Sequence, residues 1–239
     1  MNPHAGLAGA ARKFVRKLGY DVVHHLDFGL LLRELEIDLL IDVGANIGQA
    51  YDKFRLAGFR GPIVSFEPHP ACFAHLKSRP DKFGNWSRLN IAVGLKDAEQ
   101  TLYFGPTPDQ TSLLTGMDDP SKGSLSVHVR SLESLWPELG FDRYRRVFLK
   151  TDAEGFDFQI LQGAKKYFDR IAGGMMESRP VPEYDNESPM TEVLAYLSAH
   201  GFEVCRVDAD TVLPTTGICS NFNVTFCQRN LLLKLKPAV

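Results

Sequence analysis

The chain has 239 residues, of which 44% are hydrophobic, and its formal net charge at pH 7 is -2. A chain of this length and composition can bury one full hydrophobic core, so one α/β domain is expected. The near-neutral charge argues against a general nucleic-acid binder, which would carry a basic surface. No apolar run approaches the roughly 20 residues that a membrane-spanning helix needs.

The N-terminal part of the sequence predicts a helical segment over residues 1–37, ahead of a domain over residues 38–230. Leu7 to Leu18 is amphipathic and not apolar, so no secretory signal peptide is expected. The four cysteines lie far apart without C-x-x-C spacing, at positions 72, 205, 219 and 227. This arrangement favours free thiols and a cytoplasmic protein over a disulfide framework or a zinc site.

Apolar runs in the remaining sequence predict seven core strands, near 39–43, 62–67, 88–93, 147–151, 173–178, 202–207 and 222–228. Helical patterns, such as those over 156–168 and 189–200, fill most of the gaps. This alternation predicts an α/β fold with a doubly wound, mostly parallel seven-stranded sheet, the Rossmann-like outline of class I methyltransferases. The last two strands are joined by a loop and should be antiparallel. The stretch 100–130 is expected to be an insertion with two exposed strands.

The first predicted strand leads into a glycine-bearing turn. Leu39–Val43 is an apolar run that contains one acid, Asp42, and the turn that follows has Gly44, Asn46 and Gly48 at alternate positions. A helix and a second strand come next, and that strand ends at Glu67. Open α/β sheets bind nucleosides with this order of parts: the turn contacts the ligand, and the acid binds the ribose hydroxyls.

Two ligands compete for that turn. A dinucleotide site favours G-x-G-x-x-G, whereas Asn46 stands where the middle glycine would be. Asp42 would repel a diphosphate but suits the sulfonium and ammonium groups of S-adenosylmethionine (SAM). Asn46 is also a candidate N-cap of the helix. A nicotinamide-dependent oxidoreductase and a non-catalytic nucleoside-binding module remain alternatives. The predicted cofactor-binding residues are Asp42, Gly44, Ala45, Asn46, Gly48, Glu67, Pro68, Ala92 and Asp152.

A second charged group of residues follows the fourth strand, in the order Lys150-x-Asp152-x-Glu154-Gly155. Ligands of such sheets bind at the carboxyl ends of the strands, and Glu177 ends the next strand. Asp152, Glu154 and Glu177 are therefore the predicted catalytic residues. Three neighbouring carboxylates also suit a divalent cation such as Mg²⁺, so metal dependence stays open, although SAM binding is expected without metal. His128 is the alternative base.

Several short sequence motifs resemble those of the FkbM-type SAM-dependent methyltransferase family, from about Ile37 to Arg229. They are Asp42-Val43-Gly44-Ala45-Asn46-Ile47-Gly48-Gln49, Ser65-Phe66-Glu67-Pro68, Ala92-Val93-Gly94, Thr111-Ser112-Leu113, Val129-Arg130-Ser131-Leu132, Lys150-Thr151-Asp152-Ala153-Glu154-Gly155, Leu161-Gln162-Gly163-Ala164 and Glu177. The sequence departs from the family pattern at Asp157, where a glutamate is common, and at Thr111-Ser112, where two serines are.

The resemblance implies SAM-dependent O-methylation, in many members of a sugar or polyketide hydroxyl. The Gly48-Gln49 variant with Ser65–Pro68 looks like members placed in bacterial polysaccharide or glycolipid pathways. We therefore expect an O-methyltransferase acting on a hydroxyl of a sugar, glycan or glycosylated small molecule, with no nucleic-acid partner. The segments 105–128 and 179–189 are the expected acceptor walls. Tyr184 is a candidate to stack on a sugar ring, and the alternative is a tyrosine exposed on a surface loop. The sequence indicates no oligomeric state.

Overall fold

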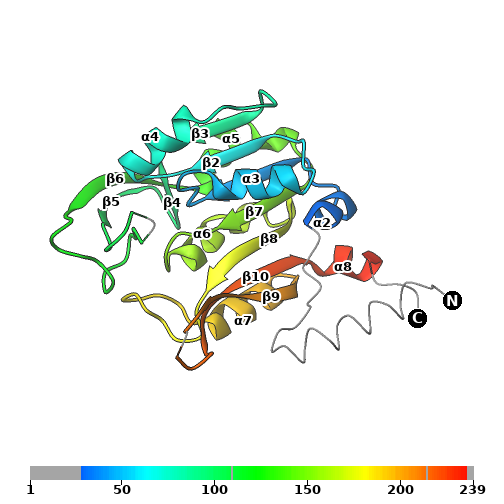
Figure 1. Cartoon of the computed structure of the whole chain (residues 1–239). Coiled ribbons are helices and arrows are strands. Elements are labelled where there is room, and N and C mark those ends of the chain that lie inside the picture. Colours follow the sequence, from blue (N-terminus) through cyan, green and yellow to red (C-terminus); the bar gives the residue numbers. More distant parts are fainter. Residues whose placement is uncertain (1–27, 109, 214, 236–239) are drawn as a thin grey trace, which may run out of the picture.

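The computed structural model describes residues 28–108, 110–213 and 215–235 (Figure 1). The amphipathic helix expected over 7–18 lies outside these residues. The strands are β1 (Leu39–Val43), β2 (Ile63–Phe66), β3 (Trp86–Leu89), β4 (Ala92–Gly94), β5 (Ala98–Tyr103), β6 (Ser124–Ser131), β7 (Val147–Thr151), β8 (Ile171–Ser178), β9 (Phe202–Val212) and β10 (Cys219–Gln228). The helices are α2 (Phe28–Glu34), α3 (Gln49–Leu56), α4 (Pro70–Ser78), α5 (Leu132–Glu138), α6 (Asp157–Gly163), α7 (Met190–Ala199) and α8 (Arg229–Leu235), with 3-10 turns η1 (Phe141–Arg143) and η2 (Lys165–Tyr167).

A seven-stranded sheet with the order β3-β2-β1-β7-β8-β10-β9 forms the centre of the described chain. Neighbouring strands from β3 to β8 are parallel, and β10 is antiparallel to both β8 and β9. The predicted doubly wound, mostly parallel sheet with an antiparallel final pair is therefore confirmed. No helix within the described ranges combines the length and the apolar character needed to cross a membrane.

The predicted third strand over 88–93 is wrong as a single element. Its first part is β3, which pairs with β2 at the edge of the main sheet, whereas its second part is β4, which pairs with β6 in a separate three-stranded sheet. Asn90 lies between the two strands, and its side-chain amide donates hydrogen bonds to the backbone oxygens of Glu67 and Pro68. These bonds hold the chain where it leaves the main sheet.

The expected insertion is this second sheet. Strands β5 and β6 are an antiparallel pair, and the polar segment 104–123 connects them. The second sheet begins with β4, which comes directly after β3 in the chain and pairs with β6 in parallel. Residues of β4 and β5 reach the carboxyl ends of β1 and β2, as the lining of the first cavity below shows.

The hydrophobic core lies on both faces of the main sheet, because successive side chains of a strand point to opposite faces. Leu39, Ile41 and Val43 of β1 belong to a cluster with residues of α5, α6 and α7, whereas Leu40 packs with residues of α2, α3 and α8. In Figure 1, α3 lies across this second face. A strand buried on both faces explains the uninterrupted apolar runs in the sequence.

The carboxyl ends of three parallel strands lie level with one another. The register places Val43 of β1 beside both Phe66 of β2 and Thr151 of β7. The residues that follow these three positions, namely the glycine turn, Glu67 and Asp152, consequently leave the sheet at one edge. The predicted helix over 156–168 begins at this edge but ends early, as α6 followed by η2.

Candidate active site

The turn after β1 takes the left-handed backbone conformation at every second residue. Gly44, Asn46 and Gly48 have φ angles of 71°, 46° and 97°. Glycine adopts this conformation freely, and asparagine tolerates it better than most residues, which accounts physically for the Gly-x-Asn-x-Gly pattern. A Cβ atom at Gly44 would lie 1.8 Å from the backbone oxygen of Asp152, so a side chain there would separate the ends of β1 and β7.

Backbone N–H groups of this turn are used inside the protein. Those of Gly44 and Ala45 both donate to the backbone oxygen of Phe66, and that of Gly48 donates to Ala45. The N–H of Asn46 donates to Oε2 of Glu67 at 2.7 Å. An anion-binding turn needs free N–H groups aimed at the ligand, and these four are not free.

Asn46 does not have the predicted role of N-cap. Gly48 is the N-cap residue of α3, and no side chain caps the helix there. Asn46 instead joins the turn to Glu67, whose other oxygen accepts the N–H of His69 at 2.7 Å. Burial raises the pKa of Glu67 to about 7. A carboxylate offers about four lone-pair sites, so Glu67 retains acceptor capacity for ligand hydroxyls.

Two cavities meet at Gly44, Asn46 and Asp152, which line both. The first cavity is bounded by the ends of β1 and β2 and by the second sheet. Its other lining residues are Val43, Glu67, Pro68, Ala92, Val93, Leu102, Pro108, Thr111, Leu113, Ala153, Glu154 and Phe156. Most of this lining is apolar. Glu67 and Glu154 supply carboxylates.

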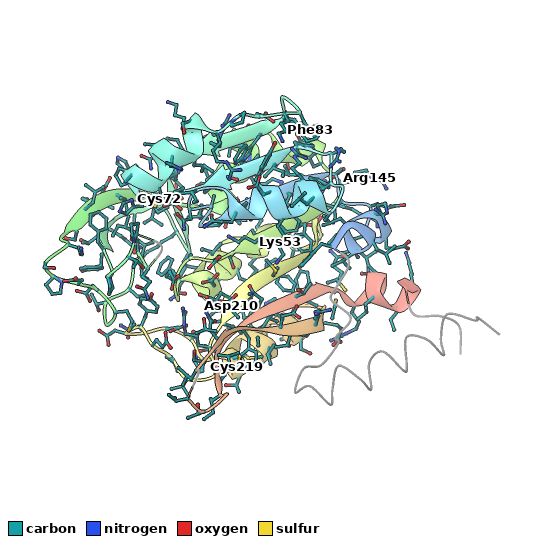
Figure 2. All side chains as sticks on the ribbon, in the orientation of Figure 1. Lys53, Cys72, Phe83, Arg145, Asp210 and Cys219 are labelled. Carbon is teal, nitrogen blue, oxygen red and sulfur yellow. The ribbon has the colours of Figure 1, made fainter. Side chains whose placement is uncertain are left out.

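The second cavity lies between α3 and the β9–β10 hairpin, and Figure 2 labels Lys53 and Asp210, which line it from these two elements. Its remaining lining residues, beyond the three shared ones, are Ala45, Gln49, Ala50, Lys150, Met175, Glu177 and Asn223. Charged and amide side chains therefore dominate this half of the site. The two halves offer an apolar and a polar environment to one ligand or to two adjacent ones.

Asp42 and Gly48 line neither cavity, although both are predicted cofactor-binding residues. Asp42 is fully buried and lies opposite Lys150 in the register of β1 and β7, with 3.1 Å between Lys150 Nζ and Asp42 Oδ1. Burial lowers the pKa of Lys150, but the negative charges of Asp42 and Asp152 together have the larger effect, so the pKa is raised. Asp42 therefore pairs with a buried lysine. The prediction that its charge faces a ligand is wrong, because the side chain is fully buried.

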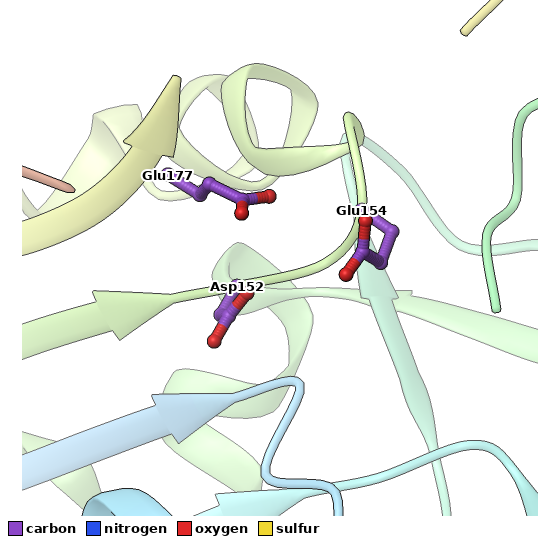
Figure 3. A group of neighbouring side chains, drawn as sticks. All are labelled: Asp152, Glu154 and Glu177. Atoms are coloured by element: carbon purple, nitrogen blue, oxygen red, sulfur yellow. The ribbon is translucent and has the colours of Figure 1, made fainter. Parts of the chain in front are cut away.

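The three predicted catalytic carboxylates come together, and Figure 3 shows them directed toward a common space. Oxygen atoms of Asp152, Glu154 and Glu177 lie within 4.8 Å of one another. Asp152 follows β7, and 47% of its side chain is exposed. This spacing also matches the oxygen ligands that a divalent cation uses.

Glu154 reaches the cluster from a turn and not from an extended strand. The extended backbone of β7 ends at Thr151, and Glu154 has a left-handed φ of 49°. The hydroxyl of Ser112 donates a 2.6 Å hydrogen bond to the backbone oxygen of Glu154, which holds this conformation. A non-glycine residue in this region costs free energy and is typically retained where function needs it.

Arg179 is the main cation beside this cluster. Its Nη2 lies 3.1 Å from both Glu154 Oε2 and Glu177 Oε2, and its other nitrogens pair with Glu183 and Glu187. Burial and the neighbouring carboxylates raise the pKa of Glu154 to about 7 and that of Glu177 to about 9, against the influence of Arg179. Asp157, beneath them at the start of α6, has a pKa raised by burial to about 6.

The expectation that Tyr184 stacks on a sugar ring is wrong, because this side chain is buried. Its ring packs against Gly155 and Arg179, and its hydroxyl donates a 2.9 Å hydrogen bond to Glu154 Oε2. Burial raises the pKa of the Tyr184 hydroxyl, as does its bond to Glu154. Tyr184 therefore holds a carboxylate of the cluster in place.

Sequence reasoning missed two members of the site. Arg179 directly follows β8, as Asp152 follows β7, but the sequence indicated it only as part of the acceptor wall 179–189 and not as a partner of the carboxylates. The side-chain amide of Asn221 donates a hydrogen bond to Glu177 Oε1. This contact depends on the pairing of β10 with β8, so the sequence around Asn221 gives no sign of it. His128, the alternative base, is exposed on β6, pairs with Glu99 and lines neither cavity.

Glu177 gives the fold a pH dependence. The folded chain holds this proton up to about pH 9 against an ordinary pKa of 4.5, so it binds more protons than the unfolded chain between these values. The free energy of unfolding should therefore fall as pH rises through this range. In Glu177→Gln the fall should be shallower, whereas exposed Glu192→Gln should keep the wild-type slope. Urea denaturation at pH 5, 7 and 9 measures it, and equal slopes in wild type and Glu177→Gln would contradict the assignment.

Comparison with known proteins places these residues in a family. A search of curated proteins gave no match. Solved structures with similar chain paths include magnesium protoporphyrin IX methyltransferase of Synechocystis PCC 6803 with bound SAM (8% identity, TM-score 0.46, 84% of this chain and 74% of that one). A precorrin-6y C5,15-methyltransferase of Geobacter metallireducens is 14% identical (TM-score 0.40, 83% and 86%). A TehB-like SAM-dependent methyltransferase of Corynebacterium glutamicum is 10% identical (TM-score 0.40, 95% and 100%). These similarities are too distant to indicate a substrate.

The family match covers most of the chain. The methyltransferase FkbM domain matches residues 42–204, from the buried acid of β1 to the start of β9. This range includes the glycine turn, Glu67, the whole second sheet, strands β2, β3, β7 and β8 of the main sheet, and all three carboxylates of the cluster. The chain therefore belongs to the FkbM methyltransferase domain family, the SAM-dependent family that its sequence motifs resemble.

Proposed function

We propose that this protein is a SAM-dependent O-methyltransferase that acts on a hydroxyl of a sugar, glycan or glycosylated small molecule. The observation that carries the proposal is the carboxylate cluster at the junction of the two cavities, in a chain of the FkbM family. A hydroxyl is a weak nucleophile at neutral pH, so its methylation benefits from a base beside the reacting oxygen. Asp152 and Glu154 are the candidate bases, whereas the raised pKa of Glu177, about 9, leaves it protonated at neutral pH.

The lining of the site fits SAM. The apolar first cavity suits the adenine, with Ala92, Val93 and Pro68 around it and Glu67 at the ribose hydroxyls. Asp152 and the turn residues Gly44, Ala45 and Asn46 would hold the methionine part. SAM supplies a methyl group on a positively charged sulfur, and the carboxylates beside it favour that charge.

The turn argues against the nicotinamide alternative. A dinucleotide brings a diphosphate to free backbone N–H groups at a helix N-terminus. Here the N–H groups of Gly44, Ala45, Asn46 and Gly48 are bonded within the protein, and Glu67 places a carboxyl group beside them. SAM contains no phosphate and makes no such demand.

Among the three carboxylates, Asp152 is best placed to accept the hydroxyl proton. It lines both cavities and is the most exposed of the three, whereas Glu154 and Glu177 are bound to Arg179. Lys150 Nζ lies 3.4 Å from Asp152 Oδ2 and fixes the carboxylate at the junction. Alignment of reacting groups in this way supplies on the order of 7–11 kcal/mol to such reactions, and a base adds roughly 10²–10⁴ in rate.

The acceptor walls remain the polar segment 105–128 and the loop 179–189. The two are joined, since the N–H of Asp185 donates to the backbone oxygen of Thr115 and the Thr115 hydroxyl donates to the Asp185 carboxylate at 2.8 Å. Polar walls of this kind suit a polyhydroxylated acceptor, which is recognised through many hydrogen bonds.

Methyl label from SAM should appear in glycan and glycolipid fractions and not in RNA or protein. The expectation follows from the family, the polar acceptor walls and the absence of excess positive charge. The purified chain is incubated with methyl-labelled SAM and separate fractions, and heat-denatured protein is the inactive control. Label confined to RNA or to protein would overturn the proposed acceptor class.

SAM and its demethylated product should bind the isolated protein, and NAD should not compete. Glu67→Ala should weaken SAM binding by about 1.5–3 kcal/mol, because it removes a charge-assisted hydrogen-bond acceptor. Glu133→Ala, on the exposed face of α5, is the matched control. Isothermal calorimetry measures all of these. Unchanged SAM affinity in Glu67→Ala would place the ribose contact elsewhere, and NAD binding without SAM binding would refute the cofactor assignment.

Asp152→Asn and Glu154→Gln should fold normally, and at least one should lower kcat by about 10²-fold or more, as expected for loss of a general base. SAM affinity should change less than kcat. Asp142→Asn, at an exposed position that lines neither cavity, is the control for the chemical change. Near-normal kcat in both site variants would contradict the catalytic role of this cluster.

A further inference from the structure

Arg179 occupies a position that the proposed reaction has not yet used. Only 5% of its side chain is exposed, although it lies beside a solvent-reachable cavity. Its Nη2 contacts one oxygen of Glu154 and one of Glu177, each at 3.1 Å. One nitrogen atom therefore bridges a carboxylate of β8, Glu177, and one of the turn after β7, Glu154.

Contacts within the loop 179–189 hold the Arg179 side chain in position. Glu187 pairs with Arg179 Nη1 at 3.1 Å and accepts the backbone N–H groups of Glu183 and Tyr184. The backbone oxygen of Arg179 accepts the N–H of Met190 at the start of α7. The loop 179–189 is thus folded back on its own first residue, and the guanidinium cannot swing out without breaking it.

A divalent cation at this cluster would have to compete with that guanidinium. Such an ion binds carboxylate oxygens at about 2.0–2.6 Å, and it would need the oxygens of Glu154 and Glu177. The Arg179 guanidinium already contacts one oxygen of each, at 3.1 Å, and so fixes their separation. Asp152, the third carboxylate, has Lys150 as its own cation.

We propose that Arg179 is a positioning residue that bridges Glu154 and Glu177 in place of a metal ion and so shapes the pocket around the acceptor hydroxyl. Its guanidinium supplies the positive charge and the fixed geometry, and Asp152 is left free to take the proton. The inference rests on the proposed function for the identity of the reacting oxygen, but the bridge itself is a feature of the protein alone.

Three variants test the bridge through turnover. Arg179→Met removes the charge, Arg179→Lys keeps it without the planar fork, and Tyr184→Phe removes one hydrogen bond to Glu154 while keeping the ring. Arg179→Met should lower kcat by about 10²-fold, since displacement of reacting groups by 1 Å can cost that much. Arg179→Lys should recover part of the loss, and Tyr184→Phe should lower kcat by less. SAM affinity should stay within a few-fold in all three.

Arg130→Met is the matched control, because Arg130 also forms two ion pairs but lies on the second sheet, with Asp97 and Glu138. It should leave kcat unchanged. Wild-type kcat in both Arg179 variants would overturn the proposal. Should Arg179→Met fail to fold, Arg179→Lys and Tyr184→Phe still decide, because unchanged kcat in these two would also overturn it.

Metal binding gives a readout that needs neither acceptor nor turnover. Mn²⁺ titrated into the wild-type protein should show no binding site by calorimetry. The variant Arg179→Met should gain a Mn²⁺ site, and adding Glu177→Gln to that variant should remove the site. Wild-type turnover should survive dialysis against a chelator. A stoichiometric Mn²⁺ site in the wild type, or complete loss of turnover restored by Mg²⁺, would overturn the bridge. Failure of the acceptor assay alone would instead count against the proposed function.

Discussion

The compensation of buried negative charge constrains the whole carboxyl edge of this sheet. Asp42, Glu67, Asp157, Glu177 and Glu187 are all buried there, and a buried carboxylate without a partner destabilises a fold strongly. Two cations, Lys150 and Arg179, balance most of this charge, and backbone N–H groups or retained protons balance the rest. The turn, the strand ends and the loop after β8 take positions that satisfy these partners.

Much of the fold could be predicted because its signals are local. Apolar runs buried on both faces identified six of the seven strands of the main sheet, and the loop between the last two indicated their antiparallel pairing. The stretch 88–93 was mistaken for one strand, since an apolar pattern does not show where the chain changes sheets. Asn90 makes that change, and its bonds to Glu67 and Pro68 involve residues more than 20 positions away.

In the candidate site too, residues with a local sequence signal were predicted and residues fixed by long-range contacts were not. The sequence indicated Asp152 and Glu154 because they follow one apolar strand, and Glu177 because it ends the next, and the structure brings their oxygens together. Asp42 and Tyr184 were misjudged, because their partners Lys150 and Glu154 are fixed by strand register and by a left-handed turn. Asn221 could not be found from the sequence at all, since its contact depends on how β10 pairs with β8.

The two cavities are built from different kinds of structure. Strand ends of the central sheet and residues of the second sheet form the first, and several of them, such as Val43, Val93 and Phe156, also belong to the hydrophobic core. The outer part of the β9–β10 hairpin supplies Asp210 and Asn223 to the second, where the Asn223 amide donates to Asp210 across the two strands. A hairpin can lengthen or shorten by paired residues without moving the sheet beneath it. Within this architecture, the part of the second cavity that the hairpin lines can therefore change during evolution while the strand ends and their carboxylates stay in place.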